Sequence, residues 1–191
     1  MALQISEIGT GDWAAYFAVS PTFLVESVLE CEVVNGGLGG ITLREKVVST
    51  PYAKYDQSER HTEWAKHFDL RTWGVFLATE DGQPVGGGAV APPSPAMIVS
   101  NGRPDTAALF DVRVSAAVRN RGIGAAIFGR CVQWAKSRGF KFLAIETQDN
   151  NIPACRFYAK KGCELLEIRR FAYRDSPRVE NETMLVWRLT L

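Results

Sequence analysis

Alternation of strand-like and helix-like segments is the feature of this sequence that most limits its fold. In the C-terminal half, short apolar runs are separated by segments whose apolar residues recur with the period of a helix. The clearest helix covers residues 122–138, where Ile123, Ile127, Cys131 and Trp134 form one apolar stripe. Strands are predicted at 108–114, 141–147, 164–173 and 182–191, and a short helix is predicted to begin near Pro153. This order predicts an α/β or α+β fold, with helices packed on a mixed sheet.

The N-terminal half is predicted to contribute two hairpins and a short helix. Residues 23–34 alternate between apolar side chains and Glu26, Glu30 and Glu32, which is the pattern of a half-buried strand with one wet face. The elements that follow are the turn NGG at 35–37, a returning strand at 41–48 that Pro51 ends, a helix at 58–68 capped by Ser58, and a hairpin at 72–91. Residues 86–105 are rich in glycine and proline and predict a loop after a strand.

Composition limits the kind of partner. The 191 residues, 46% of them hydrophobic, can bury one core, and we expect a single domain over residues 1–191. A net charge of +1, from 22 basic and 21 acidic residues, gives no one-sided positive field, so a nucleic-acid partner is not expected. The sequence shows neither an apolar run of about 20 residues, as a membrane span needs, nor a signal-peptide pattern. The four cysteines are predicted to be buried thiols, which favours a cytoplasmic protein without a metal.

The stretch RNRGIGAAI, residues 119–127, has the composition of an anion-binding turn before a helix. Glycines let the backbone approach a ligand closely, and the N–H groups at a helix start attract phosphate. A nucleotide P-loop is excluded because two alanines, and not Lys-Ser/Thr, follow Gly124. A dinucleotide-binding fold stays open, with Glu146 at the ribose position, although Ile127 replaces its third glycine. The third interpretation is a pyrophosphate held by main-chain N–H groups, with arginines leading into the turn.

A second segment favours the pyrophosphate. The spacing of Arg119, Gly122, Gly124 and Ala125 resembles the coenzyme A loop of the GNAT superfamily of N-acetyltransferases. NIPACRFYAKKGC, which begins at residue 151, is similar to the second signature of that superfamily, N-x-x-A-x-x-[LF]-Y-x-K-x-G-F, with Cys163 in place of the final phenylalanine. The resemblance implies a mixed, mostly antiparallel central sheet flanked by helices and splayed between the strands near 107–114 and 141–147.

The resemblance also implies acetyl-CoA as the acetyl donor. It makes residues 70–191 the acetyl-CoA-binding core and residues 20–68 the variable acceptor side. The residues that it implies for the donor are Val112, Arg113, Val114, Arg119, Asn120, Arg121, Gly122, Ile123, Gly124, Ala125, Asn151, Tyr158 and Lys160.

Acetyl transfer to an amine requires a base, because an amine with a pKa of about 10.4 is almost fully protonated at pH 7. Glu146, at the end of a predicted strand, is the preferred base, and Asp111 is the second choice; either would act directly or through water. The resemblance makes the main chain of Val112 or Val114 the donor to the developing oxyanion. It makes Tyr158 the acid that protonates the departing sulfur.

Within the superfamily, SPRVENET and FLVESVLECEVV resemble stretches of the streptothricin acetyltransferases, as does the region around PYAKYDQ. This narrower resemblance implies a primary amine of a small molecule as acceptor, with streptothricin as one candidate, attacked directly in a ternary complex. It places Tyr52 and Tyr55 on the acceptor side. Asp111 and Glu146, the two candidate bases, are expected to face the acceptor as well. A protein or peptide N-acetyltransferase and a non-catalytic acyl-CoA-binding sensor stay open as alternatives. Two-fold pairing is common in the superfamily, so a homodimer stays open as well.

Overall fold

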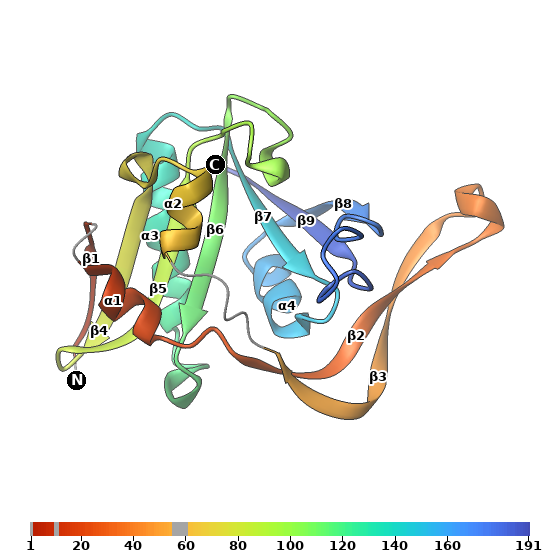
Figure 1. Cartoon of the computed structure of the whole chain (residues 1–191), viewed down its shortest axis with the longest axis horizontal. Coiled ribbons are helices and arrows are strands. Elements are labelled where there is room, and N and C mark those ends of the chain that lie inside the picture. Colours follow the sequence, from red (N-terminus) through yellow and green to blue (C-terminus); the bar gives the residue numbers. More distant parts are fainter. Residues whose placement is uncertain (1, 10–11, 55–60) are drawn as a thin grey trace. The chain divides into compact units, whose positions relative to one another are not determined.

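The computed structural model describes residues 2–9, 12–54 and 61–191, and the chain divides into two compact units (Figure 1). The first unit consists of Met1–Thr22, Tyr55–Ile145 and Thr190–Leu191, and the second of Phe23–Lys54 and Glu146–Leu189. Strand β7, Phe142–Gln148, begins in the first unit and ends in the second.

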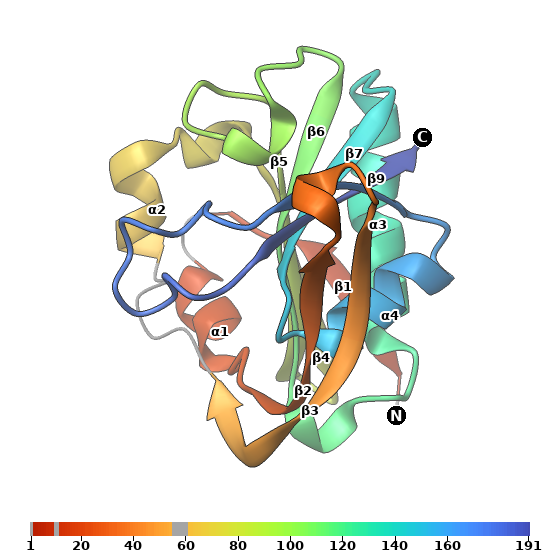
Figure 2. The same ribbon diagram turned by 90° about the vertical axis from the view of Figure 1, so that its right-hand side faces the viewer.

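The first unit is a sheet with helices on both faces. Its strands are β1 (Leu3–Glu7), β4 (Gly74–Glu80), β5 (Gln83–Ala91), β6 (Thr106–Val114) and the first part of β7, in the order β1-β4-β5-β6-β7. The neighbouring pairs are antiparallel except β6 and β7, which are parallel. The helices are α1 (Trp13–Ala18), α2 (His61–His67) and α3 (Ile123–Ser137). Figure 2 shows α1 and α2 on one side of strands β4 to β6 and α3 on the other.

Three consecutive glycines in β5 allow this close packing. A Cβ atom at Gly86 or Gly88 would lie 2.7 or 2.5 Å from the side chain of Ile127 in α3. A Cβ atom at Gly87, on the opposite face, would lie 2.5 Å from the ring of Tyr16 in α1. The prediction of a loop over residues 86–105 was therefore wrong for its first part, because these glycines belong to a buried strand and the loop begins after Ala91.

The second unit contains a long two-stranded ribbon and a smaller sheet. β2 (Phe23–Val33) and β3 (Ile41–Lys54) pair antiparallel around the short 3-10 turn Asn35–Gly37. The end of β7 is followed by α4 (Ile152–Lys160), β8 (Glu164–Arg169) and β9 (Met184–Thr190), with the strand order β7-β9-β8. The predicted mixed, mostly antiparallel sheet flanked by helices is confirmed.

Several predicted boundaries were wrong for local reasons. Pro51 does not end β3, because it lies where the register with β2 shifts between Val25 and Ser27, and proline is tolerated where the ladder is interrupted. The strand predicted at 164–173 ends at Arg169, and turns occupy the residues up to β9. β1 and α1 were not predicted, because five- and six-residue elements are too short to show a period. The proposed cap Ser58 lies outside the described residues.

β6 and β7, the two strands that are predicted to separate, pair over only the first part of β6. The parallel pairs run from Thr106 with Phe142 to Leu109 with Ile145. β6 continues to Val114 and pairs there with β5, up to the pair of Val114 with Gly86. The register therefore ends within the region in which the sequence predicted the splay.

Candidate functional site

The glycine turn at residues 119–125 forms the N-terminus of α3. Asn120 has a φ of 64° and Gly122, the N-cap residue, has a φ of 86°, so the chain turns twice through the left-handed region. The first helical bond runs from the N–H of Ala126 to the carbonyl of Gly122, at 3.0 Å. The N–H groups of Ile123, Gly124 and Ala125 precede it and have no acceptor within the helix. The local geometry is that of an anion-binding helix start.

The two arginines of this turn are bound to the protein itself. Arg119 donates from Nε to the carbonyl oxygen of Val114 at 3.1 Å, and its guanidinium also donates to the carbonyl oxygen of Thr22. Arg121 donates to Glu80 Oε1 at 2.9 Å. These contacts shape the turn and engage both guanidinium groups, so the main-chain N–H groups of the helix start are the more direct candidates for holding an anion. A phosphate contact by Arg119 or Arg121 stays a prediction.

Asp111 and Arg113 of β6 belong to a buried network. Tyr16 Oη and Arg113 Nε both donate to Asp111 Oδ2, each at 2.6 Å. The Arg113 guanidinium lies 4.8 Å from the ring centroids of Tyr16 and Phe17, which is the range of a cation–π contact. Burial and the adjacent Asp111 charge raise the pKa of Tyr16 well above its ordinary value. These contacts connect α1 with β6. They favour a structural role for Asp111 over a role as the general base of acetyl transfer.

Asp111→Asn is expected to destabilise the protein by about 3 kcal/mol, because it removes one partner of a buried ion pair and leaves the Arg113 charge uncompensated. Chemical unfolding at neutral pH measures the loss. The matched control is Glu32→Gln, which removes one partner of an exposed cross-strand pair with Arg44 and should leave the unfolding midpoint unchanged. A stable Asp111→Asn protein with strongly reduced acetyl transfer would instead support Asp111 as a catalytic residue.

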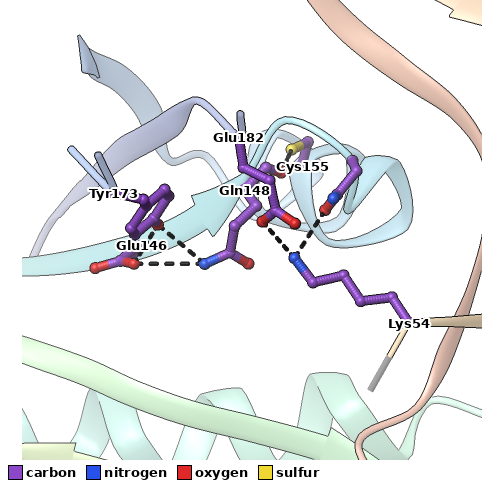
Figure 3. Close-up of polar contacts among 7 residues, drawn as sticks. Lys54, Glu146, Gln148, Cys155, Tyr173 and Glu182 are labelled. Atoms are coloured by element: carbon purple, nitrogen blue, oxygen red, sulfur yellow. Dashed lines mark hydrogen bonds and ion pairs between the residues drawn. The ribbon is translucent and has the colours of Figure 1, made fainter. Parts of the chain in front are cut away.

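Glu146 lies at the end of β7 and is the centre of a polar cluster (Figure 3). Tyr173 Oη donates to Glu146 Oε1 at 2.5 Å. Gln148 Nε2 donates to Tyr173 Oη at 3.0 Å and lies 3.4 Å from the same Glu146 oxygen. Burial raises the pKa of the Glu146 carboxyl, against the opposing effects of the Tyr173 hydrogen bond, the Arg169 charge and the Gln148 hydrogen bond. A raised pKa brings a carboxylate closer to the range that suits a general base.

Helix α4 carries the second signature. The Asn151 side chain caps the helix by accepting from the N–H of Ala154 at 3.2 Å. Tyr158 is buried, 7% exposed, and its ring meets that of Phe157 edge to face. Lys160 is exposed in the last turn of the helix. Cys163, the one departure from the signature, is buried, as was predicted for this cysteine.

Tyr52 lines a cavity of about 280 Å³ within the second unit. The other residues that line it are Val28, Asp149, Asn150, Arg178, Val179, Asn181 and Glu182. Lys54, two residues after Tyr52, forms an ion pair with Glu182 and lies 3.5 Å from Asn150 Oδ1 (Figure 3). Tyr55, the other tyrosine predicted for the acceptor side, lies outside the described residues.

The predicted site residues thus fall into two groups. Asp111 to Val114 and the turn at 119–125 belong to the first unit, and Tyr52, Glu146, Asn151, Tyr158 and Lys160 belong to the second. Among the described residues, no group of three or more His, Cys, Asp or Glu side chains could hold a metal ion. Nor does any described helix have the length and apolar character of a membrane span.

Comparison with known proteins identifies the family. The model of the acetyltransferase (GNAT) family matches residues 42–163, well over half of the chain. The chain belongs to the GNAT family.

The curated relatives of this GNAT chain include two streptothricin acetyltransferases. The chain is 39% identical to streptothricin acetyltransferase of Escherichia coli over 83 residues, which are 44% of this chain and 48% of the relative. It is 36% identical to streptothricin acetyltransferase A of Bacillus subtilis (strain 168) over 81 residues, 42% of this chain and 46% of the relative. The alignments span about half the length of each relative.

Solved structures show the same GNAT fold along the whole chain. The crystal structure of nourseothricin acetyltransferase gives a TM-score of 0.78 at 23% identity, covering 100% of this chain and 99% of the other. A provisionally named streptothricin acetyltransferase from Bacillus anthracis str. Ames was solved in complex with acetyl coenzyme A. Its structure gives a TM-score of 0.78 at 22% identity, covering 100% of this chain and 98% of the other. At these identities the likeness concerns the fold alone.

Sequence reasoning missed Tyr173 and Gln148. Gln148 could have been found, because it lies two positions after Glu146 in the same strand and therefore on the same face. Tyr173 gave no such signal, because it lies 27 residues after Glu146 in a segment that was predicted as a strand.

Proposed function

We propose that this GNAT chain transfers the acetyl group of acetyl-CoA to a primary amine of a small molecule, with streptothricin as the first acceptor to test. The observation that carries the proposal is the family match over residues 42–163, which includes both the glycine turn of α3 and helix α4. The relatives from E. coli and B. subtilis support the choice of acceptor. A homodimer and a cytoplasmic location stay predictions.

The donor side of the proposal rests on the start of α3. Acetyl-CoA carries a pyrophosphate, and three successive N–H groups at residues 123–125 have no acceptor within the helix. Gly122 has a φ of 86°, at which the backbone of a residue with a side chain would be strained, so this position favours glycine. The remaining donor contacts are assigned to the main chain of Val112 to Val114 and to Asn151 and Lys160 by resemblance.

The acid and base of the proposal come from the second unit. Glu146 takes a proton from the amine, directly or through water, and Tyr158 gives one to the departing thiolate. Glu146 is partly removed from solvent and accepts a hydrogen bond from the Tyr173 hydroxyl. Tyr158 is a buried residue of α4. The amine attacks the thioester directly, and no cysteine is required as a nucleophile.

The acceptor side of the proposal uses the cavity at Tyr52. Its lining includes the carboxylate of Asp149, the amide of Asn150, the guanidinium of Arg178 and the carboxylate of Glu182, which is paired with Lys54. Burial raises the pKa of Asp149, against the opposing effect of hydrogen bonds to Thr183. Such polar groups around a modest volume suit a small molecule that carries amines more than a long peptide.

A thiol-release assay tests the proposal. Acetyl-CoA is offered with streptothricin, polyamines, aminoglycosides and N-terminal peptides, and the free thiol of coenzyme A is measured. We expect turnover with a small amine and the highest kcat/KM with streptothricin. Turnover with peptides alone would support a protein N-acetyltransferase. Binding of acetyl-CoA without release on any amine would support the sensor alternative.

A further inference from the structure

We propose that Tyr173 is a positioning residue for Glu146: its hydroxyl holds Oε1 of the carboxylate and so fixes the orientation of the group that accepts the proton of the amine. The inference rests on the proposed function, in which Glu146 is the base. It adds a residue that lies in neither of the two signatures, which end at Ala125 and Cys163.

The direction of the hydrogen bonds follows from the groups themselves. A side-chain amide nitrogen only donates and an ionised carboxylate only accepts. Gln148 Nε2, 3.0 Å from Tyr173 Oη, therefore donates to the phenol, and the single phenolic proton goes to Glu146 Oε1. Figure 3 shows both donors at the same carboxylate oxygen. Both donors therefore act on Oε1.

The segment between β8 and β9 holds Tyr173 in place. Its successive turns are closed by hydrogen bonds from Ser176 N to Tyr173 O at 2.8 Å, from Val179 N to Ser176 O at 2.9 Å and from Glu182 N to Val179 O at 2.9 Å. The end of the segment is attached to β3 by the ion pair between Glu182 and Lys54. The same segment supplies Arg178, Val179, Asn181 and Glu182 to the cavity proposed for the acceptor. The segment that carries Tyr173 thus also forms part of the lining of that cavity, although Tyr173 itself is not one of the lining residues.

Within the second unit, the charged group of β8 that acts on Glu146 is Arg169, which is itself paired with Glu167 at 2.7 Å. Glu182 acts on Tyr173, and Gln148 is the neutral donor beside both. Loss of the Tyr173 hydroxyl removes a donor to the carboxylate while the burial of Glu146 persists. Because the charged form loses the hydrogen bond, the pKa of Glu146 rises further.

Tyr173→Phe is the test, with kcat/KM for the best acceptor measured from pH 5 to pH 9. We expect the acidic limb of the profile to move to higher pH by about one unit, because a hydrogen bond to a charged group is removed. At pH values below the limb, kcat/KM should therefore fall about tenfold. The KM for acetyl-CoA should stay unchanged. Phe171→Leu alters an exposed ring of the same segment, which lies against Arg170 and Arg174, and should leave the profile unchanged.

Carboxyl carbon NMR of protein labelled at glutamate gives a readout that does not depend on activity. The Glu146 resonance, identified by its absence in Glu146→Gln, should titrate at higher pH in Tyr173→Phe than in the wild type. Gln148→Leu should raise the midpoint of this resonance by a smaller amount. This variant replaces Tyr173→Phe as the test if Tyr173→Phe does not fold. Equal midpoints in wild type and variants would overturn the inference even if the enzyme acetylates amines. A shifted midpoint in a protein that acetylates no amine would instead contradict the proposed function.

Discussion

Glu146→Gln is expected to lower kcat/KM for the amine acceptor by about 10² to 10⁴-fold at pH 7.5, the range over which a positioned general base contributes. The glutamine side chain keeps the size of the glutamate and can still accept the Tyr173 hydrogen bond at its oxygen, but it cannot take a proton from the amine. The affinity for acetyl-CoA should stay within a few-fold of the wild type. Steady-state thiol release and calorimetric titration with coenzyme A measure the two quantities.

The same variant has an expected signature in stability. Because burial raises the pKa of Glu146 above its unfolded value, the contribution of this group to stability is fully present below the unfolded pKa and is lost as pH rises through the folded pKa. Above that window the wild type carries a partly desolvated charge that Glu146→Gln lacks. The variant should therefore unfold at no lower temperature than the wild type at pH 8, and its relative stability should fall on acidification to pH 4. Full acetyl-transfer activity of Glu146→Gln from pH 6 to pH 9 would exclude Glu146 as the base.

Periodicity predicted the donor side of the fold better than it predicted the acceptor side. Helix α3 shows its apolar stripe over fifteen residues, and Ile123, Ile127, Cys131 and Trp134 are all buried as expected. The glycine run of β5 was assigned both to the predicted hairpin at 72–91, which is confirmed, and to the predicted loop at 86–105, which was wrong there. Composition alone does not distinguish a flexible loop from a strand on which two helices pack closely. That distinction depends on contacts from residues far away in the sequence.

The environment of the candidate base could not be predicted for the same reason. The position of Glu146 at a strand end follows from the pattern of β7, but its hydrogen bond comes from the turn segment that carries Tyr173. Likewise, Asp111 and Arg113 stand two residues apart and could be predicted to pair, whereas the Tyr16 hydroxyl that completes their network comes from an unpredicted helix. Local pattern therefore supplied the functional groups, and tertiary contacts supplied the surroundings that set their chemistry.

Gly124→Asp is expected to weaken the binding of acetyl-CoA by at least about thirtyfold, or roughly 2 kcal/mol, because it places a carboxylate beside the proposed pyrophosphate. The fold should tolerate the change. A Cβ atom at Gly124 would lie 3.5 Å from Val114 Cγ2, an ordinary van der Waals contact, and the residue is in the first turn of α3. A negative charge there interacts favourably with the helix dipole by about 0.3–1 kcal/mol, so the thermal midpoint of the unliganded variant should rise.

Opposite signs for stability and binding make this variant a sharp test of the helix start. A general defect in folding would lower both quantities, whereas repulsion of a bound anion lowers only the affinity. Gly124→Asn is the matched control, because it adds a side chain of the same size without the charge and should change the Kd by no more than a few-fold. The difference between Asp and Asn should shrink at high salt, since screening weakens the repulsion. Equal affinities of the two variants for coenzyme A, measured by calorimetric titration, would show that the pyrophosphate does not bind at residues 123–125.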